Sequence, residues 1–225
     1  MAKVVIDIET IGVPFEELDE HTQQYFLKNT KTEEEGALVR EQTALNSVTA
    51  RIVAIGMYNP DTHKGTVLFQ DNNTHIPTWE EDGIVYQTGD EREILRLFWE
   101  QVKRYSMIVT FNGRGFDAPV LMLRSAMLGV HITRNLMPAR FSGDQHFDLQ
   151  DQLSFYGTTK KFNLDMYARA FGVASPKDGG IEGKEVGAAY AAGRYVDIAR
   201  YNARDIKATA EIYEKWTGAF MGDRE

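Results

Sequence analysis

Apolar residues along the chain fall either in short dense runs or at helical spacing. The run Lys3–Glu9 is rich in β-branched residues, which is typical of a buried strand. Four more runs are expected to be extended: 51–58, 64–70, 107–111 and 146–149. The turn Asn59–Thr62 joins the first two of these and predicts a hairpin. Apolar residues recur every three to four positions, as in amphipathic helices, over 90–105, 117–128, 149–155, 163–171, 182–191 and 194–217.

This order of elements predicts an α/β domain in which five strands form a mixed sheet flanked by helices. Residues 13–50 depart from the pattern because they are polar and acidic. Their two helical stretches, near 17–29 and 33–45, predict a helical insertion after the first strand. We expect a single domain over residues 1–217, which includes the insertion, followed by a loose C-terminal tail over 218–225.

The composition narrows the chemistry. None of the 225 residues is cysteine, which excludes disulfides, thiolate zinc sites and a cysteine nucleophile. A metal ion would be held by oxygen or imidazole, and oxygen ligands suit magnesium, manganese or calcium. The net charge of −8 argues against a broad basic face for nucleic acid, but not against an enzyme that meets phosphates through bound cations. The short N-terminal apolar run is neither a membrane span nor a signal peptide, so we expect a cytoplasmic protein with no membrane partner.

Two acidic residues occupy alternate positions of the first predicted strand. Because side chains alternate across a strand, Asp7 and Glu9 point to the same face as Val5 and converge on one small region. A buried carboxylate without a partner costs several kcal/mol or takes up a proton, and a divalent cation would supply the missing charge. The alternative is that the strand ends here and both acids are solvated.

Two further carboxylates occur later in the chain. Asp117 begins a predicted helix after the loop Asn112–Phe116, whose glycines allow close backbone approach to a ligand; helix capping is the alternative role. Asp205 belongs to a helical stripe that is otherwise apolar apart from hydroxyls, so it needs a partner, either an arginine or a metal ion. Tyr201 lies one turn earlier and is expected to present its hydroxyl to the same place.

Three segments together resemble the exonuclease motifs of the DEDD superfamily. They are Asp7-Ile-Glu-Thr10, Asn112-Gly-Arg-Gly-Phe-Asp117 and Tyr201-x-x-x-Asp205. Position 200 is Arg200, where the histidine subtype has histidine, so the resemblance is to the tyrosine subtype. The strongest likeness, over most of residues 1–217, is to the predicted 3′–5′ exonucleases related to the proofreading domain of B-family DNA polymerases. It extends to the segments Arg51–Gly56, His146–Leu149, Asn163–Asp165 and Gly183–Val186.

The resemblance implies a ribonuclease H-like fold and 3′–5′ exonuclease activity. It also implies that Asp7, Glu9 and Asp205 hold one metal ion, that Asp7 bridges to a second, and that Asp117 supports the second directly or through water. Two divalent cations, Mg²⁺ or Mn²⁺, would clamp an in-line displacement at phosphorus, one activating a water and the other stabilising the leaving 3′ oxygen. We assign Tyr201 to orienting that water, since a tyrosine with an ordinary pKa near 10 is a poor base at neutral pH.

We expect the substrate to be single-stranded nucleic acid, with DNA favoured over RNA. An exoribonuclease acting on RNA or short oligoribonucleotides is the main alternative, because the same motifs serve both sugars. A catalytically silent binding module would have lost at least one carboxylate, and a ribonuclease H-type endonuclease usually lacks the helical tyrosine. Since no segment predicts a polymerase domain, proofreading would need a DNA polymerase or repair partner in trans.

Further residues are assigned around this site. We place Thr10, Asn112 and Phe116 at the terminal nucleotide, with Asn112 bonding sugar or phosphate and Phe116 either stacking on a base or anchoring the core. Asp148 is interpreted as a structural or supporting acid, and His146 as either a core or a surface histidine. Four lysines in late loops either steer phosphates or are scattered surface charges: Lys160, Lys161, Lys177 and Lys184.

Overall fold

The computed structural model describes residues 2–141 and 145–221 of the chain. Its strands are β1 (Lys3–Gly12), β2 (Ala50–Asn59), β3 (Lys64–Phe69), β4 (Trp79–Glu81), β5 (Ile84–Thr88), β6 (Met107–Thr110) and β7 (His146–Asp148). Its α-helices are α1 (Glu20–Leu27), α2 (Glu33–Glu41), α3 (Glu91–Val102), α4 (Asp117–Met127), α5 (Leu149–Leu153), α6 (Leu164–Phe171), α7 (Val186–Ala191) and α8 (Tyr195–Met221). Four 3₁₀ turns complete this part of the chain: η1 (Phe15–Glu17), η2 (Gln42–Leu45), η3 (Pro176–Asp178) and η4 (Gly183–Glu185).

The strands form one mixed sheet in the order β4-β5-β3-β2-β1-β6-β7. The first three strands in the sequence are joined by antiparallel pairings, and β6 and β7 add to the other side of β1 in parallel. β1 is therefore a central strand, hydrogen-bonded along both edges. The mixed α/β architecture confirms the predicted fold class.

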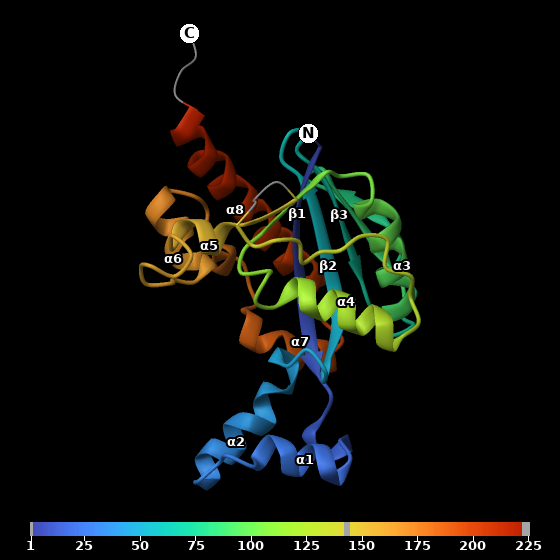
Figure 1. Ribbon diagram of the computed structural model, residues 1–225. Helices are drawn as coiled ribbons and strands as arrows, with labels where there is room; N and C mark the ends of the chain where they lie inside the picture. The colour runs from blue at the N-terminus through green and yellow to red at the C-terminus, as the bar shows by residue number, and fades with distance from the viewer. Residues whose placement is uncertain (1, 142–144, 222–225) are drawn as a thin grey trace.

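Helices cover both faces of this sheet (Figure 1). One face packs against α3 and α4 through a core that includes Ile6, Ile55 and Leu68. The opposite face packs against the helical C-terminal half, from α5 to α8, through a core that includes Val5 and Val53. Because alternate residues of β1 serve the two cores, Asp7 and Glu9 lie on the face that α8 covers.

The sheet has seven strands among the described residues rather than the five expected. The two additional strands, β4 and β5, form a hairpin, and β5 pairs in parallel with β3. Asp82 and Gly83 make its two-residue turn, with φ of 52° and 75°. An Asp-Gly pair between strands is a strong hairpin signal. The hairpin was not predicted, because its first strand, Trp79–Glu81, is a short edge strand without an apolar run.

The helices follow the predicted segments within a few residues, and local capping explains several ends. Asp90 and Glu93 form a reciprocal capping box at the start of α3, and Asn163 caps α6. The expected tail begins at position 218, whereas α8 continues to Met221; residues 222–225 lie outside the described part of the chain. Within the described residues, no helix is both long and apolar enough to cross a membrane.

The expected insertion after the first strand is helical, and α1 and α2 project beyond one end of the sheet (Figure 1). Asp19 caps α1 and Thr32 caps α2. The last turn of the insertion, η2, packs against β1, where the Thr10 hydroxyl donates to the carbonyl oxygen of Ala44 at 2.8 Å. β1 extends three residues beyond Glu9, to Gly12. The bond from Thr10 therefore anchors the insertion beside the acidic residues of this strand.

Candidate active site

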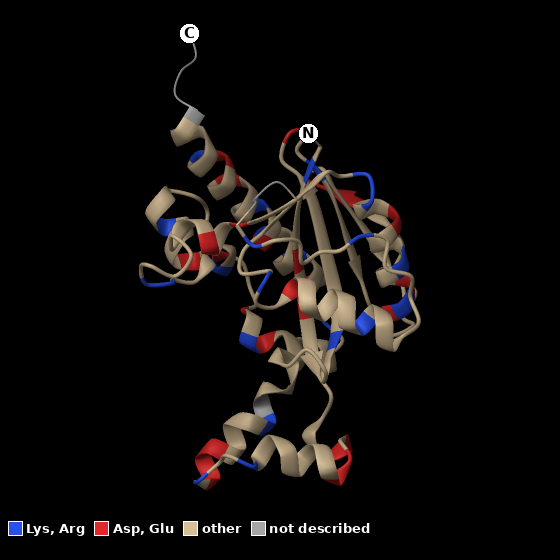
Figure 2. Cartoon of the chain, viewed as in Figure 1, with Lys and Arg blue, Asp and Glu red and all other residues tan. Residues whose placement is uncertain are grey.

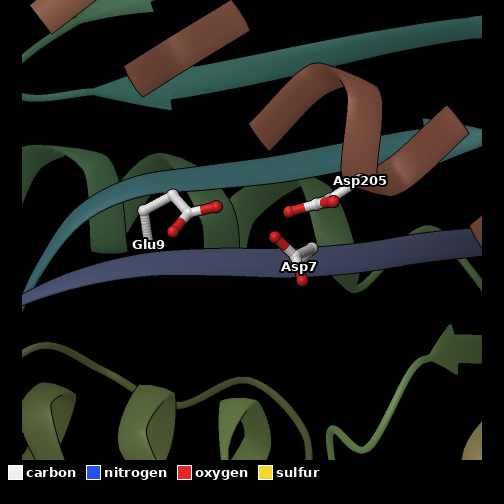
Figure 3. Close-up of side chains that lie close together, drawn as sticks. All are labelled: Asp7, Glu9 and Asp205. Carbon is white, nitrogen blue, oxygen red and sulfur yellow. The ribbon is translucent and has the colours of Figure 1, made fainter. Parts of the chain in front are cut away.

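Three carboxylates from two elements converge on one point of the sheet. Asp7 and Glu9 project from β1, and Asp205 projects from α8 toward them (Figure 3). One oxygen from each side chain lies within 4.8 Å of the other two. The fold thus brings the acidic pair of β1 beside Asp205 of α8, although the two lie about 200 positions apart in the sequence.

No basic side chain of the described residues forms an ion pair with this cluster. Among the salt bridges of the described residues, none involves Asp7, Glu9, Asp117 or Asp205. Burial, together with repulsion from neighbouring carboxylates, raises the pKa of both Asp7 and Glu9 well above its usual range. Burial also raises the pKa of Asp205 to about 7, although the Tyr201 hydroxyl and nearby cations oppose this shift.

The structure does not support the alternative roles of these three acids, a solvated strand end for Asp7 and Glu9 and an arginine ion pair for Asp205. Glu9 is only 8% exposed and β1 continues to Gly12, so the strand does not end in solvent at the acidic pair. Asp205 has no arginine partner at salt-bridge distance among the described residues, although Arg204 is close enough to lower its pKa. Buried carboxylates without a counter-charge are unfavourable. A cluster of three oxygen donors fits a hard divalent cation such as Mg²⁺ or Mn²⁺.

Asp117 lies beside the cluster rather than within it. It is the first residue of α4, but its carboxylate does not cap this helix. Instead its Oδ1 atom accepts a hydrogen bond from the backbone N–H of Ile8 at 3.1 Å, between the two acidic residues of β1. Burial raises the pKa of Asp117 to about 7, and its charge in turn raises the pKa of Asp7. Asp117 therefore lies against the backbone of β1 between Asp7 and Glu9.

Tyr201 reaches the cluster from one helical turn before Asp205. Its ring is covered by the guanidinium of Arg204, whose carbon lies 5.6 Å from the ring centroid, and Arg204 Nε donates to the carbonyl oxygen of Pro176 at 2.9 Å. Burial, and then the charges of Asp205, Glu9 and Asp7, raise the pKa of Tyr201 far above its usual value. The hydroxyl is therefore protonated throughout the neutral range and can orient a water but not accept its proton.

Sequence reasoning missed one polar residue of the site. Asn202 is fully buried on α8, and its Nδ2 atom donates to Oδ2 of Asp7 at 2.7 Å. Its Oδ1 atom has no hydrogen-bond partner among the described residues and packs against Gly56 of β2, where any side chain would collide with it. The sequence gives no signal for Asn202, because its contact with Asp7 exists only when α8 packs on the sheet.

The loop before α4 is built around Asp148. This carboxylate accepts the backbone N–H groups of Asn112 and Arg114 at 3.0 and 2.9 Å, which identifies Asp148 as a structural acid. Asn112 has a φ of 59°, a left-handed conformation that asparagine tolerates. A Cβ atom at Gly115 would lie 2.6 Å from Asn112 Oδ1, so a side chain there would displace the Asn112 carboxamide. His146 is a core histidine, bonded to Thr110 and to the Leu136 carbonyl.

The predicted nucleotide-binding residues are distributed unevenly around the cleft. Asn112 and Phe116 line a cavity of about 600 Å³ together with Asp7, Asp117 and Tyr201. The Thr10 side chain is instead engaged by the insertion, as described above, and does not line this cavity. Leu45, from the last turn of the insertion, does line it and was not predicted. Of the four lysines, Lys177 borders a neighbouring cavity that also contains Asp7 and Asp205.

The comparison with known families agrees with this site. The sequence matches the family of predicted 3′–5′ exonucleases related to the exonuclease domain of PolB over residues 43–220. The chain belongs to this family. The matched range begins within η2 and contains Asp117, Tyr201 and Asp205, whereas Asp7 and Glu9 precede it.

Curated relatives are DNA polymerases. The chain is 27% identical to DNA polymerase 1 of Sulfurisphaera ohwakuensis over 134 residues, which is 53% of this chain and 15% of that protein. It is 28% identical to the DNA polymerase of Desulfurococcus sp. (strain Tok) over 161 residues, or 63% of this chain and 20% of that protein. It is 21% identical to DNA polymerase 1 of Pyrococcus abyssi over 231 residues, or 92% of this chain and 28% of that protein. The chain thus spans less than a third of these relatives.

A solved structure shares the fold. The family B DNA polymerase from Pyrobaculum calidifontis superimposes with a TM-score of 0.62 over 96% of this chain and 24% of its own length. The sequence identity is 20%, so this likeness concerns the fold alone.

Proposed function

We propose that this protein removes nucleotides from the 3′ end of single-stranded DNA by two-metal-ion hydrolysis of the terminal phosphodiester. The observation that carries the proposal is the cluster of Asp7, Glu9 and Asp205, none of which forms a salt bridge within the described part of the chain. Divalent cations, when bound, would activate a water and stabilise the leaving 3′ oxygen. Mg²⁺ and Mn²⁺ both suit this all-oxygen donor set.

The side chains would divide the work according to their positions. Asp7, Glu9 and Asp205 would hold one cation, Asp7 would be shared with the second, and Asp117 would support the second from the edge of α4. Tyr201 would orient the attacking water through its protonated hydroxyl. Asn112 and Phe116 line the same cavity and would hold the terminal nucleotide. Thr10 would contribute by fixing the insertion to β1, a role that its bond to Ala44 supports better than direct substrate contact.

The preference for DNA is supported by the relatives, each of which is named as a DNA polymerase. Their exonuclease segment forms part of a much longer chain. We propose a single exonuclease domain over residues 1–217, with 13–50 as its insertion, that works beside a DNA polymerase or repair partner in trans.

A direct test uses 5′-labelled single-stranded DNA and RNA of equal sequence with Mg²⁺, Mn²⁺ or EDTA. We expect a ladder that shortens from the 3′ end of DNA, requires metal, and is absent in Asp205→Ala and Asp7→Ala. A ladder on RNA only would replace the substrate assignment with exoribonuclease. Internal cleavage, activity in EDTA, or full activity of both variants would overturn the proposal.

A further inference from the structure

The loop between α5 and α6 concentrates positive charge and exposed aromatic rings. Residues 154–163 contain two lysines and no acidic residue, in a protein whose net charge is −8. Figure 2 shows this basic loop at the outer edge of the α5–α6 region, whereas acidic residues cluster at the ends of the projecting insertion. Tyr156 and Phe162 are 36% and 39% exposed. Aromatic rings beside cations are the surface that single-stranded nucleic acids bind.

A groove connects this loop to the active site. A cavity of about 320 Å³ is lined by Arg114, Arg140 and Lys161, and it shares Asn112 and Gly115 with the catalytic cavity. A polymer leaving the catalytic cavity past Asn112 would therefore meet these three cations next. The two cavities are therefore neighbours on either side of Asn112 and Gly115.

The groove keeps an excess of positive charge. Arg140 and Lys161 share the single carboxylate of Asp151, at 2.6 and 3.5 Å, and their side chains remain 49% and 41% exposed. Within the described residues, the hydrogen bonds of the Arg114 guanidinium go to carbonyl oxygens, such as that of Pro138 at 2.9 Å. Among the described residues, the groove is lined by these three cations and by two carboxylates, Asp148 and Asp151, which leaves one positive charge in excess. An excess of positive charge favours phosphates.

Aromatic contacts follow a parallel route. Phe111 lines the catalytic cavity, and its ring centroid is 5.9 Å from that of Tyr167, which is in turn 5.9 Å from that of Phe162. The Nζ atom of Lys160 lies 5.3 Å from the Phe162 centroid. Phe162 is thus held on its inner side and exposed on the other, beside a cation.

We propose that the loop between α5 and α6 binds the segment of single-stranded nucleic acid that lies 5′ of the terminal nucleotide, with Lys160 and Lys161 contacting phosphates and Phe162 stacking on a base. The direction of the strand rests on the proposed function; the binding itself does not. The loop would give the enzyme a preference for longer strands over dinucleotides. An acidic protein would thereby hold a polyanion along one narrow basic strip.

Binding can be measured without cleavage. Fluorescence anisotropy of labelled dT12 measures binding to the protein with and without the Lys160→Ala/Lys161→Ala substitutions. Each comparison is made in EDTA, and again in Mg²⁺ with Asp205→Ala present in both proteins to prevent cleavage. The matched control is Lys103→Ala/Arg104→Ala, which removes the same charge from exposed residues just beyond α3, on the other side of the sheet. We expect the loop pair to weaken binding about tenfold and to flatten the slope of log K against log salt by about 1.4, since each lost single-strand phosphate contact contributes roughly 0.7.

Stacking is tested separately at Phe162. Phe162→Leu keeps an apolar side chain but loses the ring face, and we expect affinity for dT12 to fall about fivefold; Phe162→Trp should restore it. With Mg²⁺, the loop variants should raise KM for dT12 while cleavage of a dinucleotide changes less than about twofold. Thermal melting checks that every variant is folded.

The outcomes separate this inference from the proposed function. Wild-type affinity and salt slope in the Lys160→Ala/Lys161→Ala variant would overturn the loop assignment even if DNA is cleaved. The same holds if dT12 is bound neither by the wild type in EDTA nor by Asp205→Ala in Mg²⁺. Loop-dependent binding by a protein that cleaves no nucleic acid would instead support the loop and overturn the exonuclease proposal.

Discussion

The carboxamide of Asn202 donates to the carboxylate of Asp7 at 2.7 Å, and this bond joins α8 to the central strand at the centre of the acidic cluster. Hydrogen bonds from Asn202 oppose the rise in the pKa of both Asp7 and Glu9. The amide therefore supplies part of the positive potential that the cluster otherwise lacks. Its position also fixes the rotamer of Asp7, the one residue that we assign to both metal ions.

Replacing Asn202 with alanine should weaken metal binding more than it weakens the fold. Groups that orient metal ligands typically contribute about 10–100-fold to affinity, and we expect the Kd for Mn²⁺ to rise by that factor. Calorimetry or the electron paramagnetic resonance signal of free Mn²⁺ measures this directly. Nucleotide release should recover at high Mn²⁺, because Asp7 itself is retained.

The neighbouring Arg200→Ala variant is the control, because Arg200 lies on the same helix and pairs with Glu81 at the surface. An unchanged Mn²⁺ affinity in Asn202→Ala would show that Asp7 is already fixed by the strand, and that Asn202 serves packing alone.

Asp205→Asn should remove activity and yet stabilise the metal-free protein. The amide keeps the shape of the side chain while removing a buried charge that repels Asp7 and Glu9. We expect metal-dependent nucleotide release to fall below roughly 1%. In EDTA at pH 8 the free energy of unfolding should rise by as much as about 4 kcal/mol, since the pKa of Asp205 is raised from 3.8 to about 7 and each unit corresponds to about 1.4 kcal/mol. Chemical denaturation measures it, and a loss of stability would contradict the account of the cluster.

The stability of the metal-free protein should fall as pH rises. The pKa values of Asp117 and Asp205 are about 7 in the folded protein, and those of Asp7 and Glu9 are also raised. Between about pH 4 and 7 the native state therefore holds protons that the unfolded chain has released, and stability decreases across that window. We expect a lower Tm in EDTA at pH 8 than at pH 5.5.

Divalent metal should reverse this trend, because it replaces the protons with a cation. The Tm increase produced by Mg²⁺ is expected to be larger at pH 8 than at pH 5.5, and metal binding should release protons near neutral pH. An EDTA Tm that is constant or rises from pH 5.5 to 8 would contradict the assigned direction of these pKa shifts.

Most of the fold could be predicted because the buried strands have strong local signals. β1, β2, β3 and β6 are dense apolar runs, and the long amphipathic helices repeat apolar residues at fixed spacing. β4 was missed because an exposed edge strand needs no apolar run. Its Asp82–Gly83 turn carried a usable signal that periodicity alone does not weigh.

The site was predictable to the extent that chemistry sits in local motifs. Alternation on one strand placed Asp7 and Glu9 together, and a polar residue in an apolar stripe identified Asp205. Asn202 has no such signal, because its partner lies 195 positions away and its space depends on Gly56 in another strand. For Thr10 the motif predicts substrate contact, which stays a prediction; the bond from its hydroxyl to Ala44 could not be predicted, because it depends on how the insertion packs.

Leu45 should contribute to substrate binding rather than to stability. It is 66% exposed at the end of the insertion, yet it lines the catalytic cavity beside Phe116. An apolar side chain in that position can cover a nucleobase, and losing about 1 kcal/mol of contact corresponds to roughly a fivefold rise in KM. We expect Leu45→Ala to raise KM for single-stranded DNA by this amount with little change in kcat or Tm.

Leu38→Ala is the matched control, because Leu38 is 55% exposed on α2 and does not line the cavity. Equal effects of the two variants on KM would mean that the insertion acts through its overall fold. No effect of Leu45→Ala would remove the insertion from the binding site.

Tyr201→Phe distinguishes a water-orienting hydroxyl from a general base. The pKa of Tyr201 is raised far above neutrality, so the hydroxyl keeps its proton under assay conditions. We expect kcat to fall about 10–100-fold, the range typical of a lost positioning contact, while Mn²⁺ affinity changes less than about threefold. The pH–rate profile should keep its shape, because the ionisations that control it belong to the carboxylates and the metal-bound water. Disappearance of an ascending limb in Tyr201→Phe would identify the tyrosine as the base and contradict its assignment.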